Sequence, residues 1–269
     1  MTRDEQGFER GIFRRRGPQA ACAGGRSTLR MPDMKPLPFS AALVATAALL
    51  FAAASPAADW ASSVKFPEAE KAVSLFNGKD LSGWKGNEKH WSVQDGAIVG
   101  KNTAENVPKA STYLVSDKKY HAFRLVFEGK LVTSEMHTGV AIWGTPVEKE
   151  GDPHSYMGHL VMFPSAWGFY DLYRRNSIYQ DNGAARKAGR QHDWNQMEIL
   201  AQPPRIRLVV NGQSVADWTD PKPELCTEGP LGLQLHANKE PQEVHFRGLV
   251  IAENPGDKLI TVTATAPEK

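Results

Sequence analysis

Short apolar segments separated by turn residues run through most of the chain, and this pattern constrains the fold more than any other feature. Runs such as STYLVSD, FRLVFEGKLV, RIRLVV and LGLQLHA alternate with turns, and helical periodicity is nearly absent. Only FPEAEKAVSLF could form a turn or two of helix. The pattern predicts an all-β fold, a two-sheet antiparallel sandwich in one domain that covers residues 72–253.

Two dipeptides predict tight β-hairpins. Asp95-Gly96 stands between HWSVQ and AIVG, and Asn211-Gly212 stands between RLVV and QSVADW. Asp-Gly and Asn-Gly readily adopt the left-handed backbone that a two-residue hairpin turn requires. We therefore expect a pair of antiparallel strands around each dipeptide.

The N-terminal part of the chain carries a targeting signal. MKPLPFSAALVATAALLFAAASPAADW has a lysine, then an apolar run, then small residues, which is the layout of a secretory signal peptide. We expect cleavage after Ala57 or Ala58, and translation could start at Met31 or Met34. The alternatives are a long basic n-region that includes residues 1–30, and a membrane anchor, for which the apolar run is short.

These features divide the chain into four parts. They are an N-terminal extension with the signal peptide, a linker, the sandwich domain and a C-terminal tail or added edge strand, at residues 1–58, 59–71, 72–253 and 254–269. The signal predicts a periplasmic or secreted protein with no transmembrane span after processing.

Charge and cysteine content limit the function classes. The whole chain has 32 Lys and Arg against 30 Asp and Glu, a formal net charge of +2. Residues 1–58 contribute eight basic and four acidic residues, a net +4, so the remainder carries −2. No basic stripe suggests nucleic acid. Cys22 would leave with the signal peptide, so Cys226 alone can form neither an internal disulfide nor a Cys-based metal site.

Alternation along two strands predicts a groove on the outer face of one sheet. In HTGVAIWG, a glycine and an alanine lie between His137 and Trp143 on one face, and the opposite face is suited to the core. LGLQLHA repeats this design, with Gln234 and His236 opposite three leucines. Small residues between long polar ones are expected where a ligand approaches the sheet.

Aromatic and polar residues near this groove form a candidate carbohydrate site, because sugar rings stack on aromatic faces while their hydroxyls bind polar groups. The candidates for substrate binding are His137, Trp143, Tyr156, Arg175, Asn176, His192 and Gln234. The alternative for each is ordinary packing, which we expect for His90, His121 and His245. No HExxH or paired-histidine spacing supports zinc, so the metal ligands are unknown and a divalent metal is left open.

Common catalytic motifs are missing from the sequence. It contains no GxSxG, P-loop or GxGxxG motif. It also lacks the Glu-x-Asp-x-Glu strand with which a sandwich-type retaining glucanase places its nucleophile and acid. Glycoside hydrolysis by an ordinary carboxylate pair is therefore disfavoured.

Six segments taken together resemble the 3-keto-disaccharide hydrolase domain family. They are SLFNGKDLSGWKG, HWSVQDGAIVG, HTGVAIWG, DWNQMEILA, RLVVNGQSVADW and GPLGLQLHANKEPQEVHFRGLVI, and the similarity spans about residues 73–251. The resemblance implies a concanavalin A-like (lectin/glucanase) jelly-roll sandwich and bacterial export. It also implies hydrolysis or eliminative cleavage of 3-keto-glycosides that a partner glycoside 3-dehydrogenase produces.

The chain departs from this family in the middle of the domain. Family members commonly carry Asn-Ser-Gly where this chain has His137-Thr138-Gly139. They also commonly carry a Gly-Tyr-Glu-x-Gln strand, and here the Glu and Gln are replaced near Gly158 to Leu160. The groups that act on the substrate are therefore expected to differ.

The family chemistry suggests roles for several residues. A ketone at C3 acidifies the C2 proton, so cleavage needs a base, a group on the enolate oxygen and an acid for the leaving oxygen. We assign His159 as base, Arg174 or His236 to the enolate oxygen, and Tyr173 or Asp171 to the leaving group. The alternative is a non-catalytic carbohydrate-binding module of the cell envelope.

Overall fold

The structure is a computed structural model that describes residues 59–164, 168–172, 176–180, 183–237 and 240–263. The predicted signal peptide, with Met31 and Met34, lies outside these residues, and so do Tyr173, Arg174 and Arg175. Asp171 and Asn176 are described by their backbone alone.

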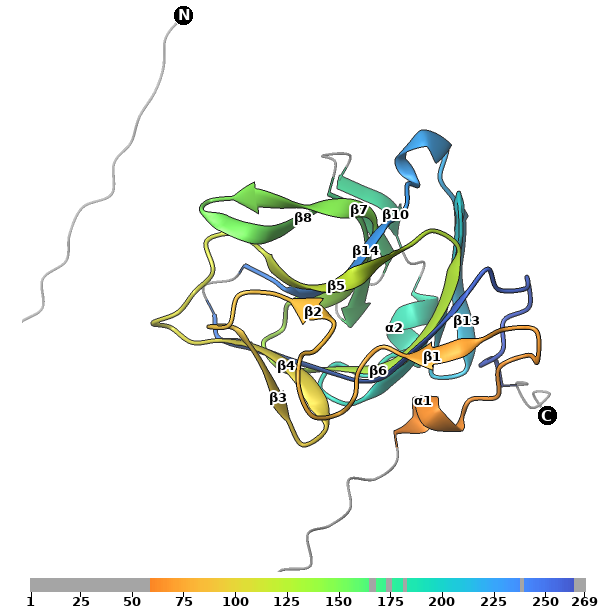
Figure 1. The fold of residues 1–269 in the computed structure, drawn as a ribbon, viewed down its shortest axis with the longest axis horizontal. Helices are drawn as coiled ribbons and strands as arrows, with labels where there is room; N and C mark the ends of the chain where they lie inside the picture. Colours follow the sequence, from red (N-terminus) through yellow and green to blue (C-terminus); the bar gives the residue numbers. More distant parts are fainter. Residues whose placement is uncertain (1–58, 165–167, 173–175, 181–182, 238–239, 264–269) are drawn as a thin grey trace, which may run out of the picture. The chain divides into compact units, whose positions relative to one another are not determined.

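Strands dominate the described residues, and the helices are short (Figure 1). The helical elements are α1 (Trp60–Ser63), α2 (Ala184–Ala188) and the 3-10 helix η1 (Pro223–Leu225). No helix in the described part of the chain has the length and apolar character needed to cross a membrane. The segment FPEAEKAVSLF forms a single turn, in which the Glu70 N–H donates to the Pro67 carbonyl at 2.9 Å, and then enters a strand.

The strands form two antiparallel sheets, here called sheet 1 and sheet 2, which lie as two layers in Figure 1. Sheet 1 has the order β13-β12-β11-β6-β15-β4-β3, with β1 beside β15. Its strands are β1 (Ala72–Ser74), β3 (Trp91–Gln94), β4 (Ala97–Asn102), β6 (Phe123–Thr133), β11 (Asn195–Gln202), β12 (Arg205–Val210), β13 (Gln213–Thr219) and β15 (Gln242–Glu253).

Sheet 2 has the order β10-β9-β8-β7-β14-β5-β2. Its strands are β2 (Trp84–Lys85), β5 (Thr112–Tyr120), β7 (His137–Lys149), β8 (Asp152–Pro164), β9 (Gly168–Asp171), β10 (Asn176–Gln180) and β14 (Gly229–Leu235). The predicted two-sheet antiparallel sandwich is therefore confirmed.

Both predicted hairpins are present. The strands β3 and β4 turn on Asp95 and Gly96, whose φ angles are 49° and 73°. The strands β12 and β13 turn on Asn211 and Gly212, with φ angles of 47° and 82°. These positive angles explain why Asn, Asp and Gly occupy the turns.

The core lies between the two sheets and is built from alternate residues of each strand. Phe163 of sheet 2 packs against Phe127 and Phe246 of sheet 1, with ring centroids 6.0 Å apart in both pairs. The three leucines of β14 also join this core, as their alternation predicted. Burying each such apolar side chain stabilises the fold by roughly 1.5–3 kcal/mol.

The two segments that flank the domain pack on the outer face of sheet 1. Arg124 of β6 is fully buried and binds Glu70 from the N-terminal side at 2.8 Å, and it also contacts Glu198. Glu198 in turn accepts a hydrogen bond from the Thr261 N–H at 2.9 Å. The predicted linker and the described part of the predicted tail therefore cover sheet 1.

Candidate functional site

A cavity of about 550 Å³ opens on the outer face of sheet 2. This volume lies in the usual range for small-molecule sites. Residues of β5, β7, β8, β9 and β14 line it, together with the residues that follow β14. Its side chains include Tyr113, Tyr156 and Leu160, which form an apolar cluster separate from the core between the sheets.

A pair of histidines stands at one end of the cavity. His137 begins β7 and His236 directly follows β14, and their ring centroids are 4.5 Å apart in an edge-to-face arrangement. Gln242, which is 1% exposed, holds both backbones. Its Oε1 accepts from the His236 N–H at 2.9 Å, and its Nε2 donates to the His137 carbonyl at 3.1 Å. The Gln242 side chain therefore fixes the backbones of both histidines relative to each other.

Both histidines favour the neutral form. Burial, and after it the neighbouring His236, lowers the pKa of His137 to about 4. Burial also lowers the pKa of His236. Desolvation penalises the charged imidazolium, so at neutral pH each ring has one nitrogen that accepts a proton and one N–H that donates.

The floor of the cavity carries polar atoms that lack protein partners. Gln234 donates through Nε2 to the Tyr113 hydroxyl at 3.0 Å, and burial raises the pKa of Tyr113, so this phenol stays protonated. Among the described residues, neither Gln234 Oε1 nor His236 Nδ1 has a hydrogen-bond partner, although both atoms are buried. Buried polar atoms are normally paired, so these two are unusual, and both of their side chains line the cavity.

The glycines of β7 and β14 do not leave open space for a sugar ring, as predicted, but allow other parts of the protein to pack closely against them. A Cβ on Gly139 would lie 2.6 Å from the Val161 carbonyl oxygen. A Cβ on Gly232 would lie 3.1 Å from Tyr113 and 3.2 Å from Tyr156. The glycines therefore admit a neighbouring strand and two tyrosine rings, and the cavity lies beside those rings.

Four predicted site residues line the cavity, and the sequence missed others. His137, Tyr156, Gln234 and His236 are in the predicted place, while their functional roles stay predictions. The residues missed include Ser111, Tyr113, Glu148 and Lys149. Tyr113 alternates with core residues in STYLVSD, but only the pairing of β5 with β14 shows that it faces Gln234.

Trp143 is not at the groove, so its predicted position is wrong. The register of β7 against β8 shifts between Ile142 and Thr145, and Trp143 has a φ of 51°. This bulge rotates the ring into the core, where it is fully buried and donates through Nε1 to the His121 carbonyl at 2.7 Å. A bulge interrupts strand alternation, which the sequence analysis assumed to be regular.

His159 also lies on the inner face of sheet 2, which contradicts its predicted place in the groove. It is fully buried, on the same face of β8 as Val161 and Phe163, and its ring packs against Trp143 at 5.4 Å between centroids. Leu160, its neighbour, lines the cavity instead. A base for a substrate in the cavity must therefore come from another residue.

His192 is an exposed residue that does not line the cavity. Its ring bonds Glu135 at 2.9 Å and the Leu131 carbonyl at 3.2 Å, its side chain is 45% exposed, and the Glu135 hydrogen bond raises its pKa. It does not line the cavity, so its predicted position is wrong. For Asp171 and Asn176 the structure gives only the pairing of their backbones, and their roles stay predictions.

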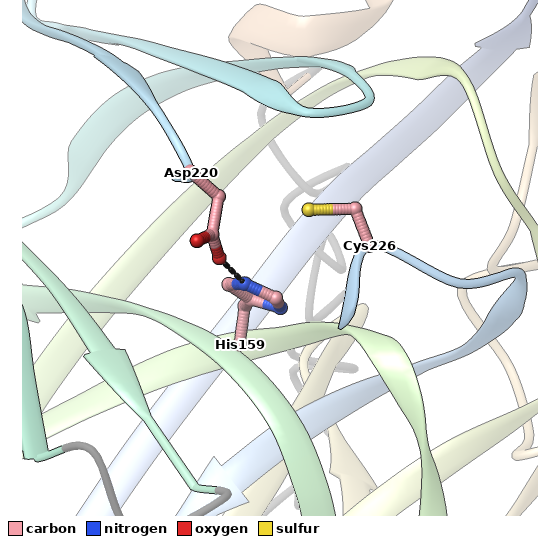
Figure 2. A group of neighbouring side chains, drawn as sticks. All are labelled: His159, Asp220 and Cys226. Carbon is pink, nitrogen blue, oxygen red and sulfur yellow. Dashed lines mark hydrogen bonds and ion pairs between the residues drawn. The ribbon is translucent and has the colours of Figure 1, made fainter. Parts of the chain in front are cut away.

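One group of side chains among the described residues could hold a metal ion. His159, Asp220 and Cys226 each direct one ligand atom toward the others (Figure 2), and these atoms lie within 4.8 Å of one another. The group lies on the inner face of sheet 2, away from the cavity. The expectation that Cys226 takes part in no metal site overlooked a mixed set of ligands, in which a single cysteine is enough.

Comparisons with known proteins agree with this fold. The family model of the 3-keto-alpha-glucoside-1,2-lyase-like domain matches residues 71–252. A proposed glycosyl hydrolase from Parabacteroides distasonis ATCC 8503 is 19% identical with a TM-score of 0.50, and the match covers 68% of this chain and 93% of that one.

A protein of unknown function with a galectin-like fold from Bacillus subtilis is 8% identical with a TM-score of 0.51. That match covers 68% of this chain and 94% of the other. A search of curated proteins finds no match. At these identities the likeness shows the fold alone, and the predicted lectin/glucanase type of jelly-roll sandwich is confirmed.

Proposed function

Because the chain belongs to the family of the 3-keto-alpha-glucoside-1,2-lyase-like domain, we propose that it cleaves 3-keto-glycosides in the cavity on sheet 2. The observation that carries this proposal is the pair of neutral histidines, His137 and His236, at the end of a cavity lined by tyrosines. The pair supplies both a proton acceptor and a proton donor at neutral pH.

His236 is the proposed base. Its side chain lines the cavity, and burial lowers its pKa and keeps the ring neutral. A neutral imidazole with a free nitrogen can remove the C2 proton that the C3 ketone makes acidic. His236 thus takes the role that the sequence analysis gave to His159.

His137 is the proposed partner of the enolate oxygen. With a pKa of about 4 it stays neutral, and it can donate an N–H to the charge that develops on the C3 oxygen. A neutral imidazole is suited to this task, because a preorganised donor stabilises the charge without first losing a proton. The Gln234 side chain, which also lines the cavity, is a proposed contact for a sugar hydroxyl.

The proposed reaction balances without a further reactant. His236 takes the proton from C2, the C2–H electrons form the enolate, and the C1–O bond breaks as the C1=C2 double bond forms. The leaving oxygen takes the proton from the His236 imidazolium. The products are an unsaturated 3-keto sugar and the aglycone alcohol, and later addition of water would give the hydrolysis products.

The outer face of β8 is consistent with this assignment. The Glu and Gln that the family commonly carries are replaced near Gly158 to Leu160, and Leu160 lines the cavity. Neither Gly158 nor Leu160 can transfer a proton. The histidines on β7 and after β14 therefore replace the missing carboxylate as the source of acid-base chemistry.

An aryl 3-keto-glucoside tests the proposal directly. We expect release of the aryl alcohol from this compound and none from the parent glucoside, whose C2 proton is not acidic. Deuterium at C2 should slow release. His236→Gln and His137→Gln should each lower kcat/KM by about 100-fold or more, while His192→Gln, an exposed histidine outside the cavity, should leave it unchanged.

Two results would reject the enzyme assignment or its residues. Full activity in both cavity variants would exclude the histidine pair as the acid-base group. Binding of parent sugars, with no release from 3-keto-glucosides, 3-keto-trehalose or 3-keto-sucrose, would identify the chain as a carbohydrate-binding module instead.

We further propose that the protein is exported and that a glycoside 3-dehydrogenase supplies its substrate. The support for export is the signal-like sequence that ends near Ala58. Expression in a bacterial host with the full N-terminus should give a periplasmic or secreted protein whose mass corresponds to a chain beginning at Ala58 or Asp59. An unprocessed cytoplasmic product would reject this proposal.

A further inference from the structure

The inner face of sheet 2 holds a second cluster of chemically active side chains. His159, Asp220 and Cys226 are 0%, 2% and 3% exposed, so the cluster is sealed from solvent. None of these side chains lines the cavity of the proposed function. We propose that they form a divalent-metal site of the zinc class, which ties the two sheets together.

The geometry brings three different donor atoms close together. His159 Nε2 lies 2.6 Å from Asp220 Oδ2, and one ligand atom from each of the three residues lies within 4.8 Å of the other two. Figure 2 shows the carboxylate and the sulfur on adjacent sides of the imidazole. Nitrogen, carboxylate oxygen and thiolate sulfur are the donors that zinc prefers.

The donors come from segments that are distant in sequence. His159 is on β8 of sheet 2, Asp220 directly follows β13 of sheet 1, and Cys226 directly follows η1. A metal ion bound to all three would cross-link both layers of the sandwich and the connection between β13 and β14. Such a link stabilises the native state by its binding free energy, because the unfolded chain lacks the assembled site.

Backbone hydrogen bonds hold Asp220 in place. Its N–H donates to the Pro204 carbonyl at 2.9 Å, and its Oδ1 accepts from the Lys222 N–H at 2.8 Å. The second contact orients the carboxylate so that Oδ2 is the oxygen directed at His159. Ligands held by outer contacts in this way bind metal without first losing conformational freedom.

Cys226 and His159 are held by a second chain of contacts. The Cys226 N–H donates to the Pro223 carbonyl at 3.0 Å, and its own carbonyl accepts from His121 Nε2 at 3.1 Å. The His121 carbonyl accepts from Trp143 Nε1, and the Trp143 ring packs edge-to-face on His159. The residues around the three ligands thus form a continuous support.

A divalent cation also suits the charge of the cluster. A thiolate and a carboxylate bring two negative charges into a low-dielectric interior, and a dication with a neutral imidazole balances them. Tetrahedral zinc with bonds of about 2.0 Å separates nitrogen and oxygen ligands by about 3.3 Å. Binding would therefore open the His159–Asp220 contact slightly, and a water would complete the coordination.

Metal analysis of the purified full-length chain tests the proposal. We expect close to one zinc per chain, or one Co²⁺ after unfolding and refolding with Co²⁺, with a thiolate-to-cobalt absorption band. Bound Co²⁺ should quench fluorescence, because the Trp143 and Trp218 rings lie 5.4 Å and 6.4 Å from the His159 ring. Cys226→Ser should abolish the cobalt band, and Asp220→Asn should lower metal retention at least tenfold.

Two matched controls separate this site from other histidines. His137→Gln changes the cavity, and His192→Gln removes an exposed histidine that also bonds a carboxylate; both variants should keep the metal and the cobalt band. A chain that takes up neither zinc nor Co²⁺ on refolding would overturn the proposal. So would a cobalt band that survives in Cys226→Ser or metal that is lost in His137→Gln.

A variant that does not fold can still be compared. Metal content is measured on the folded fraction. Cys226 of the wild type is alkylated under native conditions, with and without chelator, and its modification is read by mass spectrometry on the peptide that contains it, apart from Cys22. We expect zinc to protect Cys226 in the absence of chelator only. Equal modification under both conditions, in protein refolded with zinc, would count against the site.

Discussion

The two faces of sheet 2 both carry histidines, and they hold them in opposite ways. On the inner face, His159 is fully buried and bonds the Asp220 carboxylate at 2.6 Å. On the outer face, His137 and His236 face one another, and burial lowers both pKa values. On the inner face, the histidine belongs to a group of side chains that could bind a metal ion. On the outer face, the two histidines are neutral and lie beside a cavity.

This difference teaches that strand position decides what a histidine can do. His159 and Leu160 are adjacent in the chain, yet the first joins the interior and the second lines the cavity. The same holds for Trp143, which a bulge in β7 turns from the outer to the inner face. Variants on each face should therefore separate stability from ligand binding.

The largest expected effect is on the inner face. Trp143→Ala should lower the free energy of unfolding by about 4 kcal/mol, because it leaves a large cavity in a close-packed core. Trp194→Ala, at a partly exposed tryptophan under Arg247, should cost clearly less. Urea denaturation measures both. Trp143→Phe should leave sugar affinity unchanged, and a large loss of affinity would place Trp143 at the ligand after all.

Removing the inner carboxylate should have the next largest effect. Asp220→Ala should lower the free energy of unfolding by about 3 kcal/mol, because it removes the hydrogen-bonded carboxylate from the buried His159 ring. Asp217→Ala is the matched control, since this carboxylate lies in β13, three residues before Asp220, but pairs with Arg205 on the surface. The control should cost less than about 1 kcal/mol. Equal costs would contradict the comparison.

His137 on the outer face should make the free energy of unfolding depend on pH. Because the pKa of His137 is about 4 in the folded chain and returns to the ordinary histidine value of 6.5 on unfolding, the unfolded chain binds more protons between these pH values. Stability should therefore fall by about 2.5 kcal/mol as the pH falls from 6.5 to 4. His137→Gln should flatten this fall in urea titrations across that range, and an unchanged slope would argue against a buried neutral His137.

The smallest expected effect concerns the floor of the cavity. Gly232→Ala places a methyl group 3.1 Å from Tyr113 and 3.2 Å from Tyr156, so the rings must shift by a few tenths of an ångström. We expect a loss of about 1 kcal/mol in stability and a rise in KM of about threefold. Gly256→Ala, whose Cβ would meet Glu70 at an ordinary 3.7 Å, is the control. A lower KM in Gly232→Ala would contradict the claim that a side chain here displaces the two tyrosine rings from their place in the cavity.

Much of the fold could be predicted because it depends on local pattern. The turns at Asp95-Gly96 and Asn211-Gly212 follow from residues that tolerate positive φ. The inner leucines and outer Gln234 of β14 follow from strict alternation. The site was only partly predictable, because His159 was assigned to the outer face although the register of β8 places it inside.

The fold class, the two hairpins and the outward position of His137 on β7 and Gln234 on β14 follow from the sequence alone. Which side chains meet depends on how the strands pair and pack. The bulge that buries Trp143, the clamp of Gln242 on both cavity histidines, and the meeting of His159 with Asp220 and Cys226 all join distant segments. Local sequence sets alternation and turns, whereas contacts between distant strands depend on sheet pairing, which no local pattern specifies.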